Sequence, residues 1–467
     1  MESSLKNTSI LKLIRQSLRG EEHDYTTGSI NVAILLLAVP MILEMVMESI
    51  FAVVDVFFVS RVSVNAVATV GLTESVMMIL YSVAVGLSMA TTAIVARRIG
   101  EKDPKRAADA AFQAIVLAGI IGLTLGILGF IFAEDILLLM GAKEALIEEG
   151  LGYTQIMYAG NLSIFLLFLL NAIFRGAGSP AIAMYSLIIA NGLNIILDPI
   201  FIFGYGPIPA MGVEGAAIAT TIGRSVGVLF QLYFILRVGS KIRLVRQNMV
   251  IRASTIWEMI KISAGGISQF LIETASWIFL VRIMATFGEE ALAGYTIAFR
   301  VIIFTLLPSW GMANAAATLV GQNLGANQPD RAEKSVWRTA LYNTLFLLFV
   351  SILFFAFAED ILGVFKQNEQ VTAIGKSALK IICLGYIFFS YGMVIGQAFN
   401  GAGDTFTPMI INLVVFWLIQ IPLAYGLAIH WNYGSDGVFA CIAICHSLYA
   451  VVAMIIFKRG KWKLTKV

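Results

Sequence analysis

Charged side chains are scarce in this chain of 467 residues, in which Asp, Glu, Lys and Arg together make up only 13%. Apolar residues make up 59%, which is more than a soluble protein of this length needs to fill its core. The composition therefore predicts a polytopic membrane protein. Cysteine is rarer still, and Cys383, Cys441 and Cys445 all fall in apolar stretches, which argues against a disulfide framework.

The sequence also lacks the motifs of several function classes. No G-x-x-x-x-G-K-[S/T] loop occurs, so we do not expect ATP to be the direct energy source. There is no His-Glu metal motif, nucleophile–base arrangement or cofactor loop, which argues against an enzyme and predicts no cofactor. Cys441, Cys445 and His446 have no fourth ligand, so we expect core residues there rather than a metal site. A receptor would need an extramembrane domain to sense or signal with, and the sequence shows none, which argues against that class. The basic clusters suit anionic lipid head groups rather than nucleic acid.

Long apolar stretches dominate the rest of the chain. Twelve of them are long enough to cross a bilayer, and they follow one another with short joins. The predicted transmembrane helices span residues 31–60, 64–97, 105–133, 148–174, 181–204, 212–237, 255–286, 291–321, 333–358, 372–399, 407–430 and 436–457. The residues before them are polar and lack the apolar core of a signal peptide, which predicts a cytoplasmic tail.

Lys and Arg alternate between the joins and so predict the orientation of the helices. Both terminal tails, residues 97–106, residues 237–252 and the join after the eighth helix are rich in basic residues. The joins on the other side hold only Arg61, Lys143 and Lys366. By the positive-inside rule both termini are cytoplasmic, which an even number of helices also requires. We expect the protein to lie in the plasma membrane.

An internal repeat divides the chain into two halves of six helices. Residues 98–107 (RIGEKDPKRA) recur as residues 323–332 (NLGANQPDRA), a shift of 225 positions. The same shift places residues 174–178 (FRGAG) on residues 399–403 (FNGAG). Because six is an even number, both halves enter the membrane from the same side. They are therefore expected to be related by a pseudo-two-fold axis along the membrane normal.

The predicted fold is thus an all-α polytopic membrane protein with twelve transmembrane helices in two six-helix bundles. The expected domains are a cytoplasmic tail at 1–30, an N-terminal lobe at 31–237, a cytoplasmic linker at 238–254, a C-terminal lobe at 255–457 and a cytoplasmic tail at 458–467. A cleft between two such bundles, open to one side at a time, is the architecture of alternating access.

The first predicted helix interrupts its apolar pattern with three carboxylates, Glu44, Glu48 and Asp55. Spacings of four and seven residues put them on one helical face, with Pro40 one turn before Glu44. A carboxylate at the bilayer centre costs about 2.5–3.5 kcal/mol, so this face must meet protein, water or a cation rather than lipid. The shift of 225 places a further acid, Glu273, opposite Glu48. We predict that these acids help to line a pathway for cations.

The fifth predicted helix carries a second polar face. Asn191, Asn194 and Asp198 share it, and Pro199 leaves a nearby backbone carbonyl free. Carboxylate, amide and carbonyl oxygens that converge in a dry site suit a hard cation and equally a proton. The face therefore predicts a site that exchanges H⁺ for a cation. The alternative is that Asp198 and Asn194 only bond each other or nearby helix backbone.

Intramembrane basic residues leave a structural interpretation open. Lys261, Arg282 and Arg300 lie within predicted helices and could pair with Glu273 or with the acids of the first helix. A purely structural network of ion pairs is therefore an alternative for Glu44 and Glu273.

Together these features resemble the multidrug and toxic compound extrusion (MATE) transporters over residues 31–457. The resemblance rests on Pro40 followed by Val54-Asp55, on residues 194–204 (NIILDPIFIFG) and on residues 212–220 (GVEGAAIAT). In the second half it rests on residues 321–326 (GQNLGA) and on residues 401–405 (GAGDT) before Pro408.

The resemblance implies export of bulky organic cations by a protein that exchanges them for inward Na⁺ or H⁺. It implies a cation or proton site at Asp55, Asn194, Asp198 and Thr220, where Na⁺ is the only metal expected. Glu273 matches a seventh-helix Glu of the NorM-like branch, but the tenth-helix Asp of that branch is missing from residues 386–391 (YIFFSY), which favours the N-terminal lobe. Further candidates for substrate binding or coupling are Glu44, Glu48, Glu273 and Asn191. The expected partners are organic cations and the bilayer, and we expect a functional monomer.

A flippase for lipid-linked saccharides, from the same superfamily, is the alternative function. Such a protein holds an anionic pyrophosphate and should have a basic cavity. The intramembrane charge of the first half is acidic, which favours cations. Arg224, Lys261, Arg282 and Arg300 keep the alternative open.

Overall fold

The computed structural model describes residues 10–21, 23–238 and 241–467, and the regular elements in these ranges are all helical. Ten helices in these ranges are long and apolar enough to cross a membrane, and two bent pairs bring the number to as many as twelve. The predicted fold class is therefore confirmed. Residues 1–9 and 22 of the predicted tail and residues 239–240 of the predicted linker lie outside the described ranges.

The first six spans form the bundle that we call the N-lobe. Its helices are α3 (Ile30–Val59), α4 (Val64–Gly100), α5 (Pro104–Ile131), α7 (Glu144–Ala159) with α8 (Asn161–Gly176), α9 (Pro180–Phe203) and α10 (Val213–Tyr233), which a π-helix (Phe234–Val238) continues. A short helix, α6 (Ala133–Leu139), joins α5 to α7. Local chemistry defines the ends: Asp103, for example, caps α5 by accepting the Arg106 N–H, and Pro104 occupies the first turn.

The remaining spans form the bundle that we call the C-lobe. Its helices are α11 (Ala253–Ala285), α12 (Glu289–Gly325), α13 (Pro329–Gly363), α14 (Glu369–Cys383) with α15 (Tyr386–Ala402), the span Phe406–His430 and α18 (Gly434–Lys458). The span Phe406–His430 alternates α16 (Phe406–Asn412) and α17 (Ile421–Tyr425) with two π-helical segments, Leu413–Gln420 and Gly426–His430.

The fourth span of each lobe is broken at the same place. Helices α7 and α8 meet at 41° around Gly160, and α14 and α15 meet at 60° around Leu384 and Gly385. Gly160 and Gly385 are separated by the repeat distance of 225 positions. The repeat seen in the sequence is thus also present in the irregularities of the helices.

A helix also lies within the segment that the sequence predicts only as a polar tail. This helix, α2 (Ile10–Arg19), buries Leu13 and Ser17 against the start of the N-lobe. The Ser17 hydroxyl donates a hydrogen bond to the Leu36 carbonyl of α3 at 2.7 Å. Its charged and apolar residues lie on different faces, a pattern that a search for membrane-spanning stretches does not detect.

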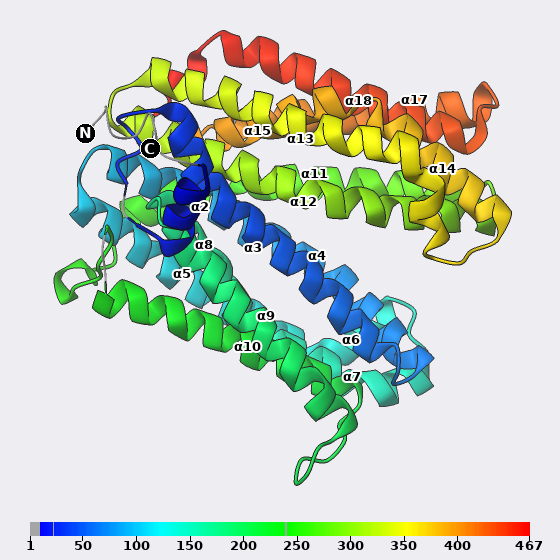
Figure 1. The fold of residues 1–467 in the computed structure, drawn as a ribbon. Helices are drawn as coiled ribbons and strands as arrows, with labels where there is room; N and C mark the ends of the chain where they lie inside the picture. Colours follow the sequence, from blue (N-terminus) through cyan, green and yellow to red (C-terminus); the bar gives the residue numbers. More distant parts are fainter. Residues whose placement is uncertain (1–9, 22, 239–240) are drawn as a thin grey trace.

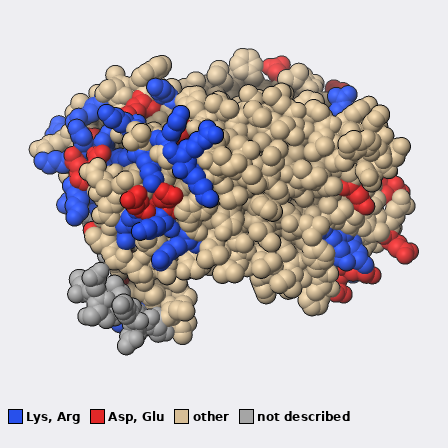
Figure 2. All heavy atoms as spheres, turned by 90° about the horizontal axis from the view of Figure 1, so that it is seen from above, with Lys and Arg blue, Asp and Glu red and all other residues tan. Residues whose placement is uncertain are grey.

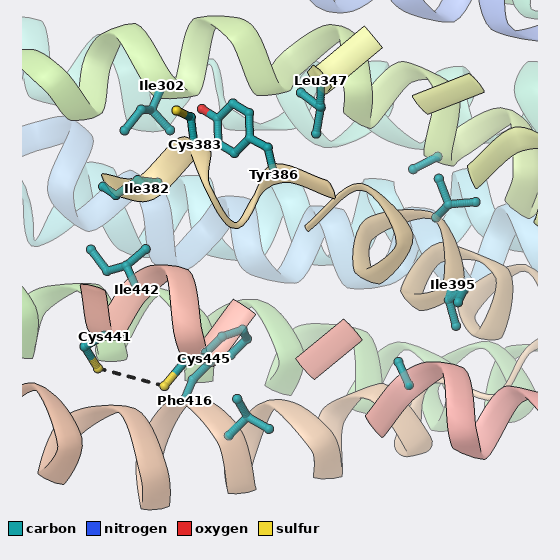
Figure 3. Packing of buried hydrophobic residues seen from close by; sticks show 14 of the residues in the cluster. Ile302, Leu347, Ile382, Cys383, Tyr386, Ile395, Phe416, Cys441, Ile442 and Cys445 are labelled. Atoms are coloured by element: carbon teal, nitrogen blue, oxygen red, sulfur yellow. Dashed lines mark hydrogen bonds between the residues drawn. The ribbon is translucent and has the colours of Figure 1, made fainter. Parts of the chain in front are cut away.

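The two lobes meet near α2 and the C-terminal residues and splay apart at the opposite end (Figure 1). Lys and Arg gather at the end where α2 and the C-terminal residues lie, which we call the basic end, and a broad uncharged belt covers the middle of the face shown in Figure 2. Each lobe has its own apolar core. Figure 3 shows part of the C-lobe core, where Cys441 and Cys445 are buried with their sulfur atoms 3.9 Å apart. All three cysteines are free, as the sequence predicts.

Helices α4 and α12 cross at the basic end through two glycines. A Cβ atom on Gly100 would collide with the carbonyl oxygen of Gln322, and a Cβ atom on Gly325 would collide with the carbonyl oxygen of Arg97. The repeat shift of 225 relates both the glycines and their contacts. The crossing therefore lies on the pseudo-two-fold axis and holds the lobes in backbone contact.

Candidate functional site

Helix α3 begins at the basic end and lies between the lobes, packed against α9 of its own lobe and α12 of the other. Its three acids differ in environment. Glu44 is almost completely buried, with 1% of its surface exposed, and Asp55 is buried with 7% exposed. Glu48 is half-buried. All three are thus at least partly covered by protein, as their shared helical face predicts.

Glu44 forms an ion pair inside the N-lobe. Its Oε1 atom lies 3.4 Å from Nη1 of Arg175, at the end of α8. The sequence suggested Lys261, Arg282 and Arg300 as partners for the buried acids, but all three are exposed and form no ion pair with those acids in the described structure. Arg175 was not among the predicted partners. Its position in the repeat, opposite Asn400, is the signal that could have drawn attention to it.

A second basic side chain, Arg224 of α10, lies beside the same face of α3. Its guanidinium carbon is 5.6 Å from the centre of the Phe51 ring, one turn from both Glu48 and Asp55. Arg224 also interacts electrostatically with those two carboxylates. The face therefore carries three acids and meets two guanidinium groups, those of Arg175 and Arg224.

The polar face of α9 forms a compact cluster with α10. The Asn194 amide donates to Asp198 Oδ1 at 3.2 Å and to Thr220 Oγ1 at 3.1 Å. All three residues are buried, and Asp198 is fully buried. Asn191 is buried on the same face and donates to the Met47 carbonyl of α3 at 3.2 Å. The structure thus brings together three of the four residues that the resemblance assigns to a cation site.

Asp55 of α3 lies near this cluster, as the electrostatic interaction of its carboxylate with that of Asp198 shows. Two acceptor atoms of the cluster, Asp198 Oδ2 and Asn194 Oδ1, are buried and have no hydrogen-bond partner among the described residues. Buried acceptors without a partner are costly and need an explanation. Two carboxylates with neutral oxygens from Asn194 and Thr220 have the chemistry to hold one monovalent cation or a proton.

The other main feature is a cavity of about 470 Å³ in the C-lobe, on the side that faces the N-lobe. Glu273 is the only carboxylate among the described residues that line it, and aromatic side chains such as Trp277, Phe299 and Tyr449 cover its walls. Met78 of α4 contributes from the opposite lobe. An apolar, aromatic cavity with a single acid suits a lipophilic cation.

Two further charged residues, one on each lobe, also interact. Glu74 of α4 and Arg300 of α12 are both exposed, and they interact electrostatically.

The described residues contain no group of three or more His, Cys, Asp or Glu side chains that could hold a metal ion. The residues 386–391 that lack an acid in the sequence contribute Tyr386 and Phe389 to the cavity wall.

Comparisons with known proteins agree on one family of transporters. The family model MatE matches residues 40–200 and 267–426, one segment in each lobe. A relative from Thermotoga maritima, described as "Probable multidrug resistance protein NorM", is 28% identical over 440 residues, which are 93% of each chain.

Solved structures give the same picture. "Crystal structure of MATE in the straight conformation" superposes with a TM-score of 0.87 at 26% identity and covers 96% of this chain and 99% of its own. "Outward-facing conformation of a multidrug resistance MATE family transporter of the MOP superfamily" superposes with a TM-score of 0.87 at 26% identity and covers 98% and 99%.

Proposed function

Since this chain belongs to the MatE family of transporters, we propose that it is a secondary active antiporter that exports organic cations in exchange for inward Na⁺ or H⁺. Several of its relatives are named multidrug resistance or multidrug export proteins, which supports drug-like small molecules as cargo. The observation that carries the mechanism is the buried cluster of Asp55, Asn194, Asp198 and Thr220, with its two unpartnered acceptor oxygens among the described residues.

The energetics require a coupled ion. Moving one positive charge against 100 mV costs about 2.3 kcal/mol, so the export of cations has to be driven. The acid cluster in the N-lobe supplies a place for the driving ion, and the aromatic cavity with Glu273 in the C-lobe supplies a place for the cargo. A carboxylate that holds a proton or a cation in one state and releases it in the other provides the exchange.

The orientation follows from the distribution of charge. By the positive-inside rule the basic end, with both termini, lies on the cytoplasmic side of the plasma membrane. The lobes then meet on the cytoplasmic side and splay towards the outside, in keeping with the outward-facing conformation described for one similar structure. We expect this conformation to receive the driving ion from outside and to release cargo there. We expect the monomer to be the functional unit.

Transport in proteoliposomes tests this function. We would follow a fluorescent organic cation, impose a Na⁺ gradient and a pH gradient separately, and compare the wild type with Asp198→Asn. One gradient should drive transport and identify the coupling ion, and Asp198→Asn should abolish the driven component because it removes the charge that binds the ion. Asp135→Asn, at an exposed carboxylate, is the matched control and should transport normally.

The following combined result would contradict the proposal. If neither gradient moves any tested cation and Asp198→Asn behaves as the wild type, the acid cluster has no coupling role. A lipid-linked saccharide would then become the preferred cargo, and Arg224 would be the side chain to test for binding of its pyrophosphate.

A further inference from the structure

The ion pair between Glu44 and Arg175 has a neutral counterpart in the other lobe. The repeat shift of 225 places Glu44 on Gln269 and Arg175 on Asn400. Gln269 Nε2 donates to Asn400 Oδ1 at 3.0 Å, and Asn400 Nδ2 donates to Gln269 Oε1 at 3.3 Å. In each lobe, therefore, one polar bridge ties the first span to the end of the broken fourth span: α3 to α8 in the N-lobe and α11 to α15 in the C-lobe.

The neutral bridge shows that this architecture does not need charge. An amide pair satisfies both of its partners, whereas the ionic bridge leaves Glu44 Oε2 buried without a hydrogen-bond partner among the described residues. A buried ion pair is also weak evidence for stability, because both charges lose their hydration. Glu44 and Arg175 consequently need a role other than holding α3 to α8.

On one side, the ionic bridge connects to the proposed cation site through a row of charges. Glu48 follows Glu44 by one helical turn, and the two carboxylates interact electrostatically. Arg224, held over the Phe51 ring, interacts with both Glu48 and Asp55. Asp55 in turn interacts with Asp198 in the cluster of α9 and α10. A change of charge at the cluster therefore reaches Glu44 through neighbours on one face of α3.

On the other side, the bridge connects to the C-lobe. The carbonyl oxygen of Arg175 accepts a hydrogen bond from Thr318 Oγ1 of α12 at 3.2 Å. The next carbonyl, that of Gly176, accepts one from Gln322 Nε2 of α12 at 2.9 Å. These contacts lie in the half of α12 that crosses α4, so the end of α8 carries both the ion pair and a contact between the lobes.

We propose that Glu44 and Arg175 are positioning residues, which transmit the charge of the N-lobe cation site to helix α12 and so couple ion binding to the relative position of the lobes. The inference rests on the proposed antiport. It assigns to the ionic bridge a task that the neutral bridge of Gln269 and Asn400 does not have, because no corresponding row of charges leads to Gln269 in the described part of the C-lobe.

The test gives the N-lobe the neutral bridge of the C-lobe. The double variant Glu44→Gln with Arg175→Asn removes both charges together and leaves no single buried charge unpaired. Spin labels at Val64→Cys and Val364→Cys, two exposed positions on different lobes, report the distance between the open ends in nanodiscs. The three native cysteines are buried.

In the wild type, the coupling ion should change the ratio of open to closed molecules by about fivefold or more, the usual lower range for coupling between two sites. In the double variant this change should disappear, while the ion should still raise the melting temperature because its site is intact. Arg175→Lys keeps the charge and should keep the shift. Neutralising an exposed ion pair by Glu359→Gln with Lys376→Asn is the matched control and should leave the shift unchanged.

Three outcomes are decisive. An unchanged ion-induced shift in a folded double variant overturns the inference and leaves the antiport proposal standing. A double variant that does not fold also overturns it, because the neutral bridge should suffice for the architecture. A wild type that responds to neither Na⁺ nor H⁺, in conformation or in transport, instead contradicts the proposed function itself.

Discussion

At the scale of single residues, the cavity of the C-lobe is organised around one carboxylate. Glu273 lies among Trp277, Phe299 and Tyr449, and the rings of Trp277 and Phe299 are 4.5 Å apart. Aromatic faces attract a cation, and a single acid provides its counter-charge. We therefore propose that Glu273 contributes to affinity for the cargo, whereas the N-lobe acids serve the coupling ion.

Replacement of Glu273 by Gln should therefore weaken the binding of a lipophilic cation by about tenfold, because a charge-assisted contact contributes about 1.5 kcal/mol or more. Fluorescence titration of the purified protein with the cation measures this change. Glu290→Gln is the control, because Glu290 is exposed on α12 and does not line the cavity. Equal affinities in wild type and Glu273→Gln would assign the cargo to another part of the gap between the lobes.

The sequence predicted some of these residues better than others. Asn194 and Asp198 are one helical turn apart, so their proximity follows from helix geometry, and Thr220 followed from the resemblance. The partner of Glu44 did not follow, because Arg175 lies 131 positions away at the end of an apolar stretch. Helical spacing relates residues within one helix, whereas contacts between helices depend on packing that a single sequence does not state.

At the scale of elements, the crossing of α4 and α12 depends on the absence of side chains. Gly100→Ala would place a methyl group against the carbonyl oxygen of Gln322 and force the two helices apart. Overpacking of this kind costs about 1–3 kcal/mol, so the variant should melt at a lower temperature in detergent. Gly119→Ala, where a Cβ meets nothing within 4 Å, is the control and should not lower the melting temperature. A normal melting temperature for Gly100→Ala would show that the stability of the protein does not depend on this close contact between the helices.

The same scale shows where prediction of the elements succeeded and where it failed. Long apolar runs such as α3 and α9 were placed within a few residues of their observed ends. The breaks around Gly160 and Gly385 were missed, because each bent pair of helices reads as one continuous apolar run. The π-helical segments between Leu413 and His430 were missed for the same reason, since hydropathy records the presence of a span and not its hydrogen-bond pattern.

At the scale of the whole molecule, each terminal segment is held by an arginine of the opposite lobe. Arg331 of α13 donates hydrogen bonds to the carbonyl oxygens of Tyr25, Thr27 and Gly28 at 2.8–3.2 Å. Arg97 of α4 donates to the carbonyl oxygen of Thr465 at 2.7 Å. The two segments therefore brace the closed, basic end from both sides.

Arg331→Gln should loosen this end. The loss of hydrogen bonds from a charged donor is expected to cost about 1–2 kcal/mol in all, which is about 5- to 30-fold in the population of molecules open at the basic end. Spin labels at Lys105→Cys and Lys334→Cys, exposed on the two lobes, would report a longer distance in more of the molecules. Arg106→Gln, at the equivalent position of the other half, loses a surface ion pair with Asp103 and should change nothing. Identical distance distributions for Arg331→Gln and the wild type would show that Arg331 does not hold the lobes together at the basic end.

The crossing of α4 and α12 also bears on how the two halves of a duplicated gene can diverge. Gly100 and Gly325 each lie against the main chain of the other half, so a new side chain in one copy is tolerated or rejected by the other copy. Where a contact stays within one half, the two copies can differ, as the pair Glu44 and Arg175 in one and the pair Gln269 and Asn400 in the other show. Drift between the copies can therefore produce one half that handles ions and one that handles cargo, while the two glycines must be inherited together.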